Sequence, residues 1–272
     1  MPYQKLNLQD GTPLTALHLS HIETGIEAQS ESIFKGKKIS IMGDSISTFK
    51  NYIPSGNSVY YTGNNCGVTT VDDTWWKKVI NALNMTLCVN QSWSGSSVTD
   101  CKSSYGENSY GHTDYRTSRL SEGSSIPDVI IIYMGTNDLL TLNKSSVGTY
   151  NGSTDTMPTD ITTFREAYAI MLNKIITNYP EAKLYCCTLI PNHSYSPTNN
   201  VSKYTAFNEA IKEVGTVFGA EIINLSACGI NAHNLLAYLP EDGGKLHPNP
   251  AGHSLIANQV IKTLDPSIRT RY

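Results

Sequence analysis

The chain has 272 residues, of which 39% are hydrophobic and 16% charged, and its formal net charge is −3. This composition is too apolar for a disordered chain, and no apolar run is long enough to span a membrane. Basic residues form no block, so nucleic acid is not an expected partner. The first residues lack the apolar stretch of a signal peptide, which predicts a protein that stays in the cytoplasm or leaves the cell by another route, such as lysis.

Residues 1–34 differ from the rest and predict a short helical extension ahead of a main domain at residues 35–272. Gly11-Thr12-Pro13 is a turn signal, and Thr15 can cap a helix that continues to about Ser32. Short isolated helices are marginal in water, so this helix needs a partner surface. We expect it to pack on the main domain or against copies of itself, which would make the protein a homo-oligomer.

In the main domain, short apolar runs alternate with helical patterns. The runs predict five strands, at Lys38–Met42, Thr86–Asn90, Asp128–Met134, Lys183–Leu189 and Glu221–Leu225. Helices are predicted at Asp72–Leu83, Asp160–Asn178, Asn199–Phe218 and Pro250–Leu264. Asn249 before Pro250 is the expected N-cap of the last helix. This alternation indicates a parallel sheet covered by helices on both faces.

Two polar segments, residues 99–126 and 141–159, are predicted to be long loops. In an open parallel sheet, loops that follow the carboxyl ends of strands form the ligand crevice. The six cysteines include no C-x-x-C pair, so no metal site is expected. The chain also lacks a Gly-rich phosphate loop and a dinucleotide fingerprint, and we therefore expect no cofactor.

Four short polar segments carry the chemistry of this chain. They are Gly-Asp-Ser at 43–45, Asn-Gln-Ser-Trp-Ser-Gly at 90–95, Gly-Thr-Asn-Asp at 135–138 and His-Pro-Asn-Pro at 247–250. Each of the first three follows a predicted strand, so parallel strands would bring them to one edge of the sheet. The fourth precedes the last helix. A serine hydroxyl is a poor nucleophile without a base, and the histidine of the fourth segment can supply one.

These residues and their order resemble the SGNH hydrolases, also called the GDSL esterase family, over residues 37–265. The motif residues of the family correspond to Ser45, Gly95, Asn137 and His247. The resemblance implies a three-layer α/β/α sandwich with a flavodoxin-like, five-stranded parallel sheet, and ester hydrolysis through an acyl-enzyme. It also implies that Ser45 is the nucleophile and His247 the general base. The backbone N–H groups of Ser45 and Gly95 and the side-chain amide of Asn137 would form the oxyanion hole.

The chain departs from the family pattern at the third member of the triad. The usual Asp-x-x-His spacing would place the acid at position 244, which is glycine. The nearest acid is Asp242, and the two glycines after it could fold the chain so that its carboxylate lies under His247. Alternatively, a backbone carbonyl orients His247 and the protein works as a Ser-His dyad.

Three aromatic residues are candidates for binding substrate. Trp93 lies two residues before Gly95, and Tyr60 and Tyr61 lie in the loop after the nucleophile. The crevice loops are polar and tyrosine-rich, which suits sugars better than long acyl chains. We therefore expect the O-deacetylation of a carbohydrate, with a small molecule or a polysaccharide as the ester substrate. A lipolytic esterase or lysophospholipase is the alternative.

Residues 6–19 resemble a short N-terminal element of phage tail and baseplate proteins. The resemblance implies that the extension is an attachment or oligomerisation element and that the protein is associated with a virion or prophage. It also leaves open a different class of function, a non-catalytic carbohydrate-binding virion protein on the same fold.

Overall fold

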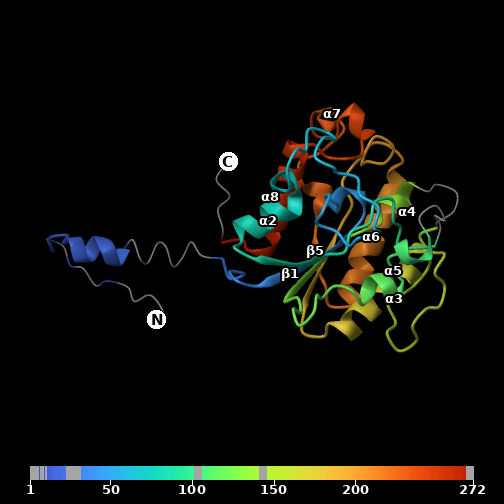
Figure 1. Ribbon diagram of the computed structural model, residues 1–272, viewed down its shortest axis with the longest axis horizontal. Helices are drawn as coiled ribbons and strands as arrows, with labels where there is room; N and C mark the ends of the chain where they lie inside the picture. Colours follow the sequence, from blue (N-terminus) through green and yellow to red (C-terminus); the bar gives the residue numbers. More distant parts are fainter. Residues whose placement is uncertain are drawn as a thin grey trace.

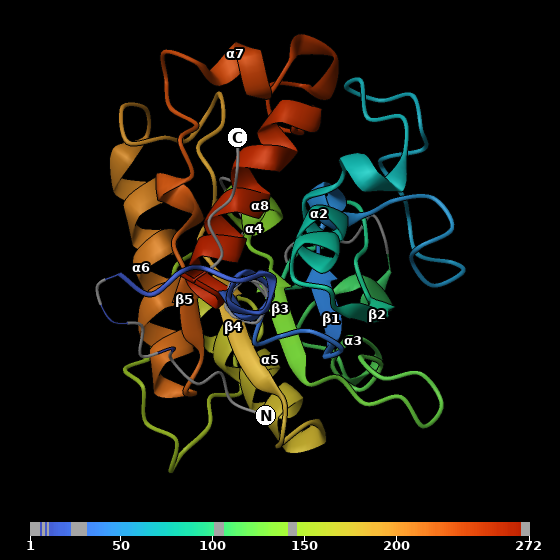
Figure 2. The same ribbon diagram turned by 90° about the vertical axis from the view of Figure 1, so that its left-hand side faces the viewer.

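The structure is a computed structural model that describes residues 6, 9, 11–22, 32–100, 106–140 and 146–267. Five strands form one parallel sheet in the order β2-β1-β3-β4-β5 (Figure 2). They are β1 (Lys38–Gly43), β2 (Thr86–Asn90), β3 (Val129–Tyr133), β4 (Lys183–Cys187) and β5 (Glu221–Ile223). The predicted α/β class and five-stranded parallel sheet are confirmed.

Helices cover both faces of the sheet and make the fold a three-layer sandwich. On one face lie α2 (Trp75–Ala82) and α8 (Pro250–Leu264), which pack against each other. On the other lie α3 (Asp114–Thr117), α5 (Phe164–Asn178) and α6 (Val201–Val217) (Figure 1). The remaining described elements are α4 (Thr136–Leu140), α7 (Leu235–Tyr238) and the 3-10 turns η1 (Ser45–Ser47), η2 (Val71–Asp73), η4 (Glu107–Ser109), η5 (Leu225–Ala227) and η6 (Glu241–Gly243).

The core is built from the sheet and the helix faces that cover it. Every residue of β3 is buried, as expected for a central parallel strand covered on both faces. Trp75 and Trp76 are both fully buried, although neighbouring positions on a helix point in different directions. The backbone N–H of Trp75 donates to Nδ1 of the buried His253 at 3.2 Å, so a side chain of α8 caps the first turn of α2.

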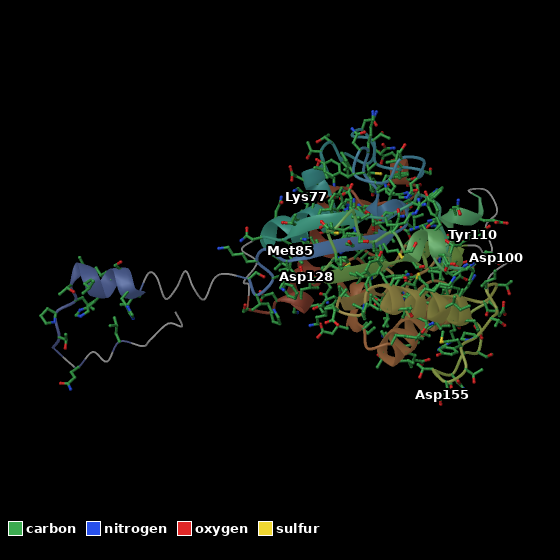
Figure 3. The ribbon with its side chains drawn as sticks, turned by 60° about the horizontal axis from the view of Figure 1, so that its bottom comes forward. Lys77, Met85, Asp100, Tyr110, Asp128 and Asp155 are labelled. Atoms are coloured by element: carbon green, nitrogen blue, oxygen red, sulfur yellow. The ribbon has the colours of Figure 1, made fainter. Side chains whose placement is uncertain are left out.

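The two ends of the sheet have different roles. Met85 and Asp128 lie at one end and Asp100 and Tyr110 at the other (Figure 3). At the first end the Asp128 carboxylate accepts a hydrogen bond from the Lys38 N–H at 2.8 Å, which ties the starts of β1 and β3 together. This bond lowers the pKa of Asp128. In open parallel sheets, ligands bind at the carboxyl ends of the strands, so the loops at the opposite end from Asp128 are the candidates for a ligand site.

Several predicted boundaries differ from the structure by a few residues. The helix expected from Asp72 begins at Trp75 after a 3-10 turn, and the one expected from Asp160 begins at Phe164. Asp160 instead closes its own turn, where its carboxylate accepts from the Thr162 N–H. Asn249 caps α8 as predicted, since its side chain accepts from the Gly252 N–H at 2.9 Å.

The N-terminal extension is described in part. Residues 16–22 are helical, and the predicted continuation towards Ser32 falls mostly outside the described residues. Ser32 itself is buried, and its hydroxyl donates to the Asp265 carboxylate at 2.8 Å. Ser32 is therefore bonded to the main domain, while the domain boundary at residue 35 stays a prediction. Within the described residues, no helix is both long and apolar enough to cross a membrane.

Candidate active site

Ser45 lies in a tight turn at the carboxyl end of β1. The Asp44 side chain caps this turn by accepting from the Ile46 N–H at 3.0 Å. A Cβ on Gly43 would lie 2.5 Å from Ser47 Oγ, so the turn can fold this closely only around a glycine. Asp44 is fully buried, and burial raises the pKa of its carboxyl to about 6. The local sequence thus fixes the turn that presents Ser45.

His247 reaches Ser45 from the segment just before α8. Its Nε2 lies 2.8 Å from Ser45 Oγ, and its Nδ1 lies 2.9 Å from the carbonyl oxygen of Gly243. A carbonyl can only accept, so Nδ1 carries the proton and Nε2 is free to accept from the serine hydroxyl. Burial lowers the pKa of His247 to about 4, which keeps the imidazole neutral near pH 7. The pair has the geometry of a nucleophile and its general base.

The expected contact between Asp242 and His247 is not the one that the structure shows. The Asp242 side chain is exposed, and its carboxylate accepts from the Cys66 N–H at 3.2 Å. Residues 241–243 form a 3-10 turn and Gly244 is left-handed, with φ of +65°. The turn therefore brings the Gly243 carbonyl, and not the carboxylate, to His247. The sequence leaves a Ser-His-Asp triad and a Ser-His dyad open, and this geometry corresponds to the dyad.

The three candidate oxyanion-hole residues are buried and follow β1, β2 and β3: Ser45 begins η1, Gly95 lies in a loop and Asn137 lies in α4. Gly95 has φ of +78°, a conformation that favours glycine and turns the backbone there. The Asn137 amide donates to the Ser96 carbonyl at 2.8 Å, which holds its side chain beside the Gly95 turn. Asp138 accepts from the N–H groups of Val98 and Thr99 at 2.8 and 2.9 Å. Residues after β3 thus hold the loop after β2.

Arg116 supports this site, although no sequence motif marks it. Its side chain is fully buried, and its guanidinium donates to the carbonyl oxygens of Gly43 at 3.0 Å and Gln91 at 2.7 Å, and to that of Ser109. Burial lowers the pKa of Arg116 to about 9, so it stays charged at neutral pH. The guanidinium clamps the carboxyl ends of β1 and β2. The only signal in the sequence is a cation within a polar loop, and that signal does not identify its partners.

The three candidate substrate-binding aromatics have different surroundings. Tyr61 is fully buried and donates to the Pro248 carbonyl at 2.8 Å, so its side chain packs inside the protein. Tyr60 stacks on the His247 imidazole, with ring centroids 3.5 Å apart and planes 10° apart. Trp93 is half-buried and contacts the Tyr115 ring edge-on.

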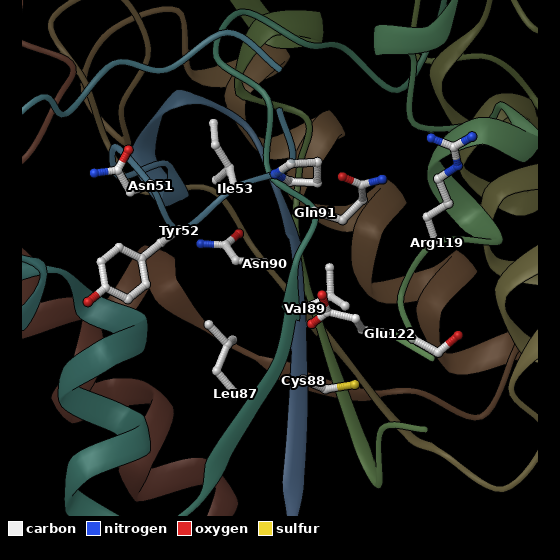
Figure 4. Close-up of a pocket in the computed structure, with 12 residues that line it drawn as sticks. Asn51, Tyr52, Ile53, Leu87, Cys88, Val89, Asn90, Gln91, Arg119 and Glu122 are labelled. Carbon is white, nitrogen blue, oxygen red and sulfur yellow. The ribbon is translucent and has the colours of Figure 1, made fainter. Parts of the chain in front are cut away.

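A cavity of about 520 Å³ lies along the outer edge of β2 (Figure 4). Its walls are residues 51–54, residues 87–91 and the side chains of Arg119, Ser121 and Glu122. None of the candidate catalytic residues lines it. Arg119 itself lies over the Tyr115 ring, 3.8 Å from its centroid. Among the described residues, no group of three or more His, Cys, Asp or Glu side chains is placed to hold a metal ion.

The family model for GDSL-like lipase/acylhydrolase matches residues 37–264, which is most of the chain. The chain belongs to the GDSL-like lipase/acylhydrolase family. Members of this family are carboxylic ester hydrolases, and so is this protein. The resemblance to the SGNH and GDSL esterases that the sequence motifs indicate is thereby confirmed. The resemblance of residues 6–19 to a phage element is not shown.

Solved structures of GDSL-like lipases are similar to this chain. A protein from Bacteroides ovatus assigned to the GDSL-like lipases has 29% sequence identity and a TM-score of 0.64, covering 83% of this chain and 96% of its own. Another, from Bacteroides uniformis, has 27% identity and a TM-score of 0.62, over 85% of this chain and 96% of its own. An acetylxylan esterase from Geobacillus stearothermophilus shares the fold at 16% identity and a TM-score of 0.54, over 88% of this chain and all of its own. No curated protein matches the chain.

Proposed function

We propose that the protein is a serine esterase that removes acetyl groups from a carbohydrate through an acyl-enzyme. The observation that carries the proposal is the 2.8 Å contact between Ser45 Oγ and His247 Nε2, with Nδ1 bonded to the Gly243 carbonyl. A buried serine that contacts a neutral imidazole of the correct tautomer is ready to transfer its proton. A binding protein without catalysis would have no need of this contact.

The reaction follows from these positions. Ser45 Oγ attacks the ester carbonyl carbon while its proton passes to His247 Nε2. The oxygen that gains negative charge accepts hydrogen bonds from the N–H groups of Ser45 and Gly95 and from the Asn137 amide. Collapse of the tetrahedral intermediate breaks the ester bond, and Nε2 returns its proton to the leaving alcohol. Water, deprotonated by the same nitrogen, then attacks the acyl-enzyme; the bond from Ser45 Oγ to the acyl carbon breaks, Oγ takes the proton back from Nε2, and the acid is released.

The surroundings of the site support an acetylated sugar as the substrate. Trp93, two residues before Gly95, is half-buried and contacts the Tyr115 ring, and the Arg119 guanidinium lies over that same Tyr115 ring. Flat rings and planar hydrogen-bonding groups suit the faces and hydroxyls of sugars. In addition, the acetylxylan esterase from Geobacillus stearothermophilus uses this fold.

The test is the hydrolysis of p-nitrophenyl acetate by the wild type, by Ser45→Ala and by the control Ser118→Ala. Ser118 is exposed, and its hydroxyl donates within its own helical turn to Asp114. We expect Ser45→Ala to lose at least about 10³-fold in kcat and Ser118→Ala to keep its activity. Equal rates in all three proteins would refute the proposal.

Acyl-chain preference separates the sugar deacetylase from a lipolytic esterase, the alternative that the family's lipase members favour. Rates on p-nitrophenyl acetate, butyrate and octanoate would be measured together with acetate release from acetylated xylan. A fall beyond acetyl supports deacetylation, and a rise with chain length supports the lipolytic reading.

For the N-terminal segment, residues 1–34, we propose a role in attachment or self-association within a phage-type assembly. Leu14, Leu17 and Leu19 are all exposed there, with Leu17 at 78%. Deleting residues 1–31 would keep Ser32 and its bond to Asp265. Sedimentation of the full and shortened chains would compare their masses, and an unchanged mass would count against self-association.

A further inference from the structure

In a Ser-His-Asp triad the carboxylate both orients the imidazole and stabilises the imidazolium that forms in the transition state. Here the group at His247 Nδ1 is the neutral Gly243 carbonyl, which can orient the ring but brings no negative charge. Burial opposes the charged form of His247, whose pKa falls to about 4. Among the described residues, no carboxylate contacts His247 to balance the charge that catalysis creates.

The face of the imidazole is occupied by Tyr60. The two rings are nearly parallel, with planes 10° apart and centroids 3.5 Å apart. An aromatic ring carries negative charge on its faces, so a cation stacked on that face is attracted to it, most strongly where water is excluded. Tyr60 thus offers the imidazolium an electrostatic partner at its face, whereas the groups at the two ring nitrogens are neutral.

Tyr60 is fixed from both the serine and the histidine sides. Its backbone N–H donates to Thr48 Oγ1 at 2.9 Å, and the Thr48 hydroxyl donates to the Ser45 carbonyl at 2.9 Å. The phenol oxygen lies 3.4 Å from Cys66 Sγ. The Cys66 backbone has φ of +53°, and its N–H donates to Asp242. Asp242 therefore supports the turn behind Tyr60 and not the imidazole itself.

The next residue strengthens the same connection. The Tyr61 ring packs edge-on against Tyr60, with centroids 4.9 Å apart, and its hydroxyl donates to the carbonyl of Pro248, the residue after His247. Two consecutive residues of the loop after the nucleophile thereby contact the histidine segment, Tyr60 at His247 and Tyr61 at Pro248. A ring held this firmly keeps its stacking geometry when the imidazole becomes charged.

We propose that Tyr60 is a positioning residue that stacks on His247 and stabilises its imidazolium form, which is the function of the carboxylate in a Ser-His-Asp triad. The inference rests on the proposed function. The titratable groups around the imidazole are Ser45 from the nucleophile turn, Tyr60 and Tyr61 from the loop after it, Cys66 and Asp242 on the outer side, and His253 from α8. The one carboxylate in this set belongs to Asp242, and it accepts from the Cys66 N–H and not from the imidazole.

The test compares Tyr60→Leu, which keeps an apolar side chain over the histidine but removes the ring, with Tyr60→Phe, which keeps the ring. Each protein is first titrated with a fluorophosphonate to count active Ser45, and kcat, KM and pH profiles on p-nitrophenyl acetate are then normalised to that count. We expect Tyr60→Leu to lower kcat about tenfold with KM nearly unchanged. We expect Tyr60→Phe to recover to within about threefold of the wild type, because the ring face remains.

The fall of kcat/KM at low pH, its acid limb, distinguishes two possible effects of the Tyr60 ring: electrostatic stabilisation of the imidazolium and simple exclusion of water. Without the ring face the imidazolium is less stable, so the limb moves to lower pH, by up to about one unit. If the ring only shielded the site, its removal would admit water and move the limb to higher pH, which would overturn the inference. Unchanged kcat in Tyr60→Leu, or equal losses in the Leu and Phe variants, would overturn it as well.

Two further controls keep the result interpretable. If Tyr60→Leu does not fold, Tyr60→Met provides a second ring-free side chain with the same expected outcomes. If the wild type does not react with the fluorophosphonate, the serine-esterase proposal fails. Full labelling with no effect of the Tyr60 variants refutes the role of Tyr60 alone.

Discussion

Replacing Asp242 with asparagine asks whether the enzyme works as a dyad. Asparagine keeps the size of the side chain and an oxygen that can still accept from the Cys66 N–H, a bond of 3.2 Å in the structure. It removes the negative charge and adds an N–H donor. A catalytic carboxylate at His247 Nδ1 would not tolerate this change, because the new donor would force the imidazole into the wrong tautomer.

The two arrangements predict very different magnitudes. In a working triad, Asp→Asn lowers kcat by about 10⁴-fold. In this structure Nδ1 is bonded to the Gly243 carbonyl at 2.9 Å, so the tautomer does not depend on Asp242. The exposed Asp242 side chain loses only part of one charge-assisted hydrogen bond, which is worth about 1 kcal/mol or less. We therefore expect kcat/KM of Asp242→Asn to stay within about threefold of the wild type.

The assay is kcat/KM on p-nitrophenyl acetate, normalised to fluorophosphonate-reactive serine, with Glu241→Gln as the matched control. Glu241 is the neighbouring exposed acid and forms an ion pair with Lys245 at 2.8 Å. Both variants should behave alike. A loss of about 10³-fold or more in Asp242→Asn alone would mean that Asp242 does serve His247 in the working enzyme, and the dyad would be refuted.

Two further predictions concern the pH profile and the buried arginine. Because the neutral imidazole is the base and burial lowers the pKa of His247 to about 4, kcat/KM of the wild type should fall as the pH drops through about 4; an acid limb between pH 6 and 7 would contradict the burial argument. Arg116→Met removes the guanidinium donor from the buried carbonyls of Gln91 and Ser109, whereas the Gly43 carbonyl keeps the Trp93 N–H at 3.1 Å. Urea denaturation should therefore show a loss of roughly 3–5 kcal/mol, and an unchanged midpoint would refute the clamp.

The fold class and the principal site residues can be predicted from the amino-acid pattern alone. The strands can be recognised as short apolar runs, because a parallel strand covered on both faces buries the side chains on both of its sides. The clearest example is β3, in which every residue is buried. Ser45, Gly95 and Asn137 follow three such runs, and parallel strands necessarily deliver them to one edge. Asn249 with Pro250 marked the start of α8 through capping chemistry that is local to a few residues.

The groups that contact these site residues could be identified only in the folded protein. Whether His247 bonds to Asp242 or to the Gly243 carbonyl depends on the path of a 3-10 turn and a left-handed glycine, and sequence spacing does not fix that path. Arg116 and Tyr60 act on segments far from them in the chain. Arg116 binds backbone carbonyls, which every residue has, so its partners leave no pattern in the sequence. Tyr60 stacks on the His247 ring, and stacking requires only that the two rings lie close together in space.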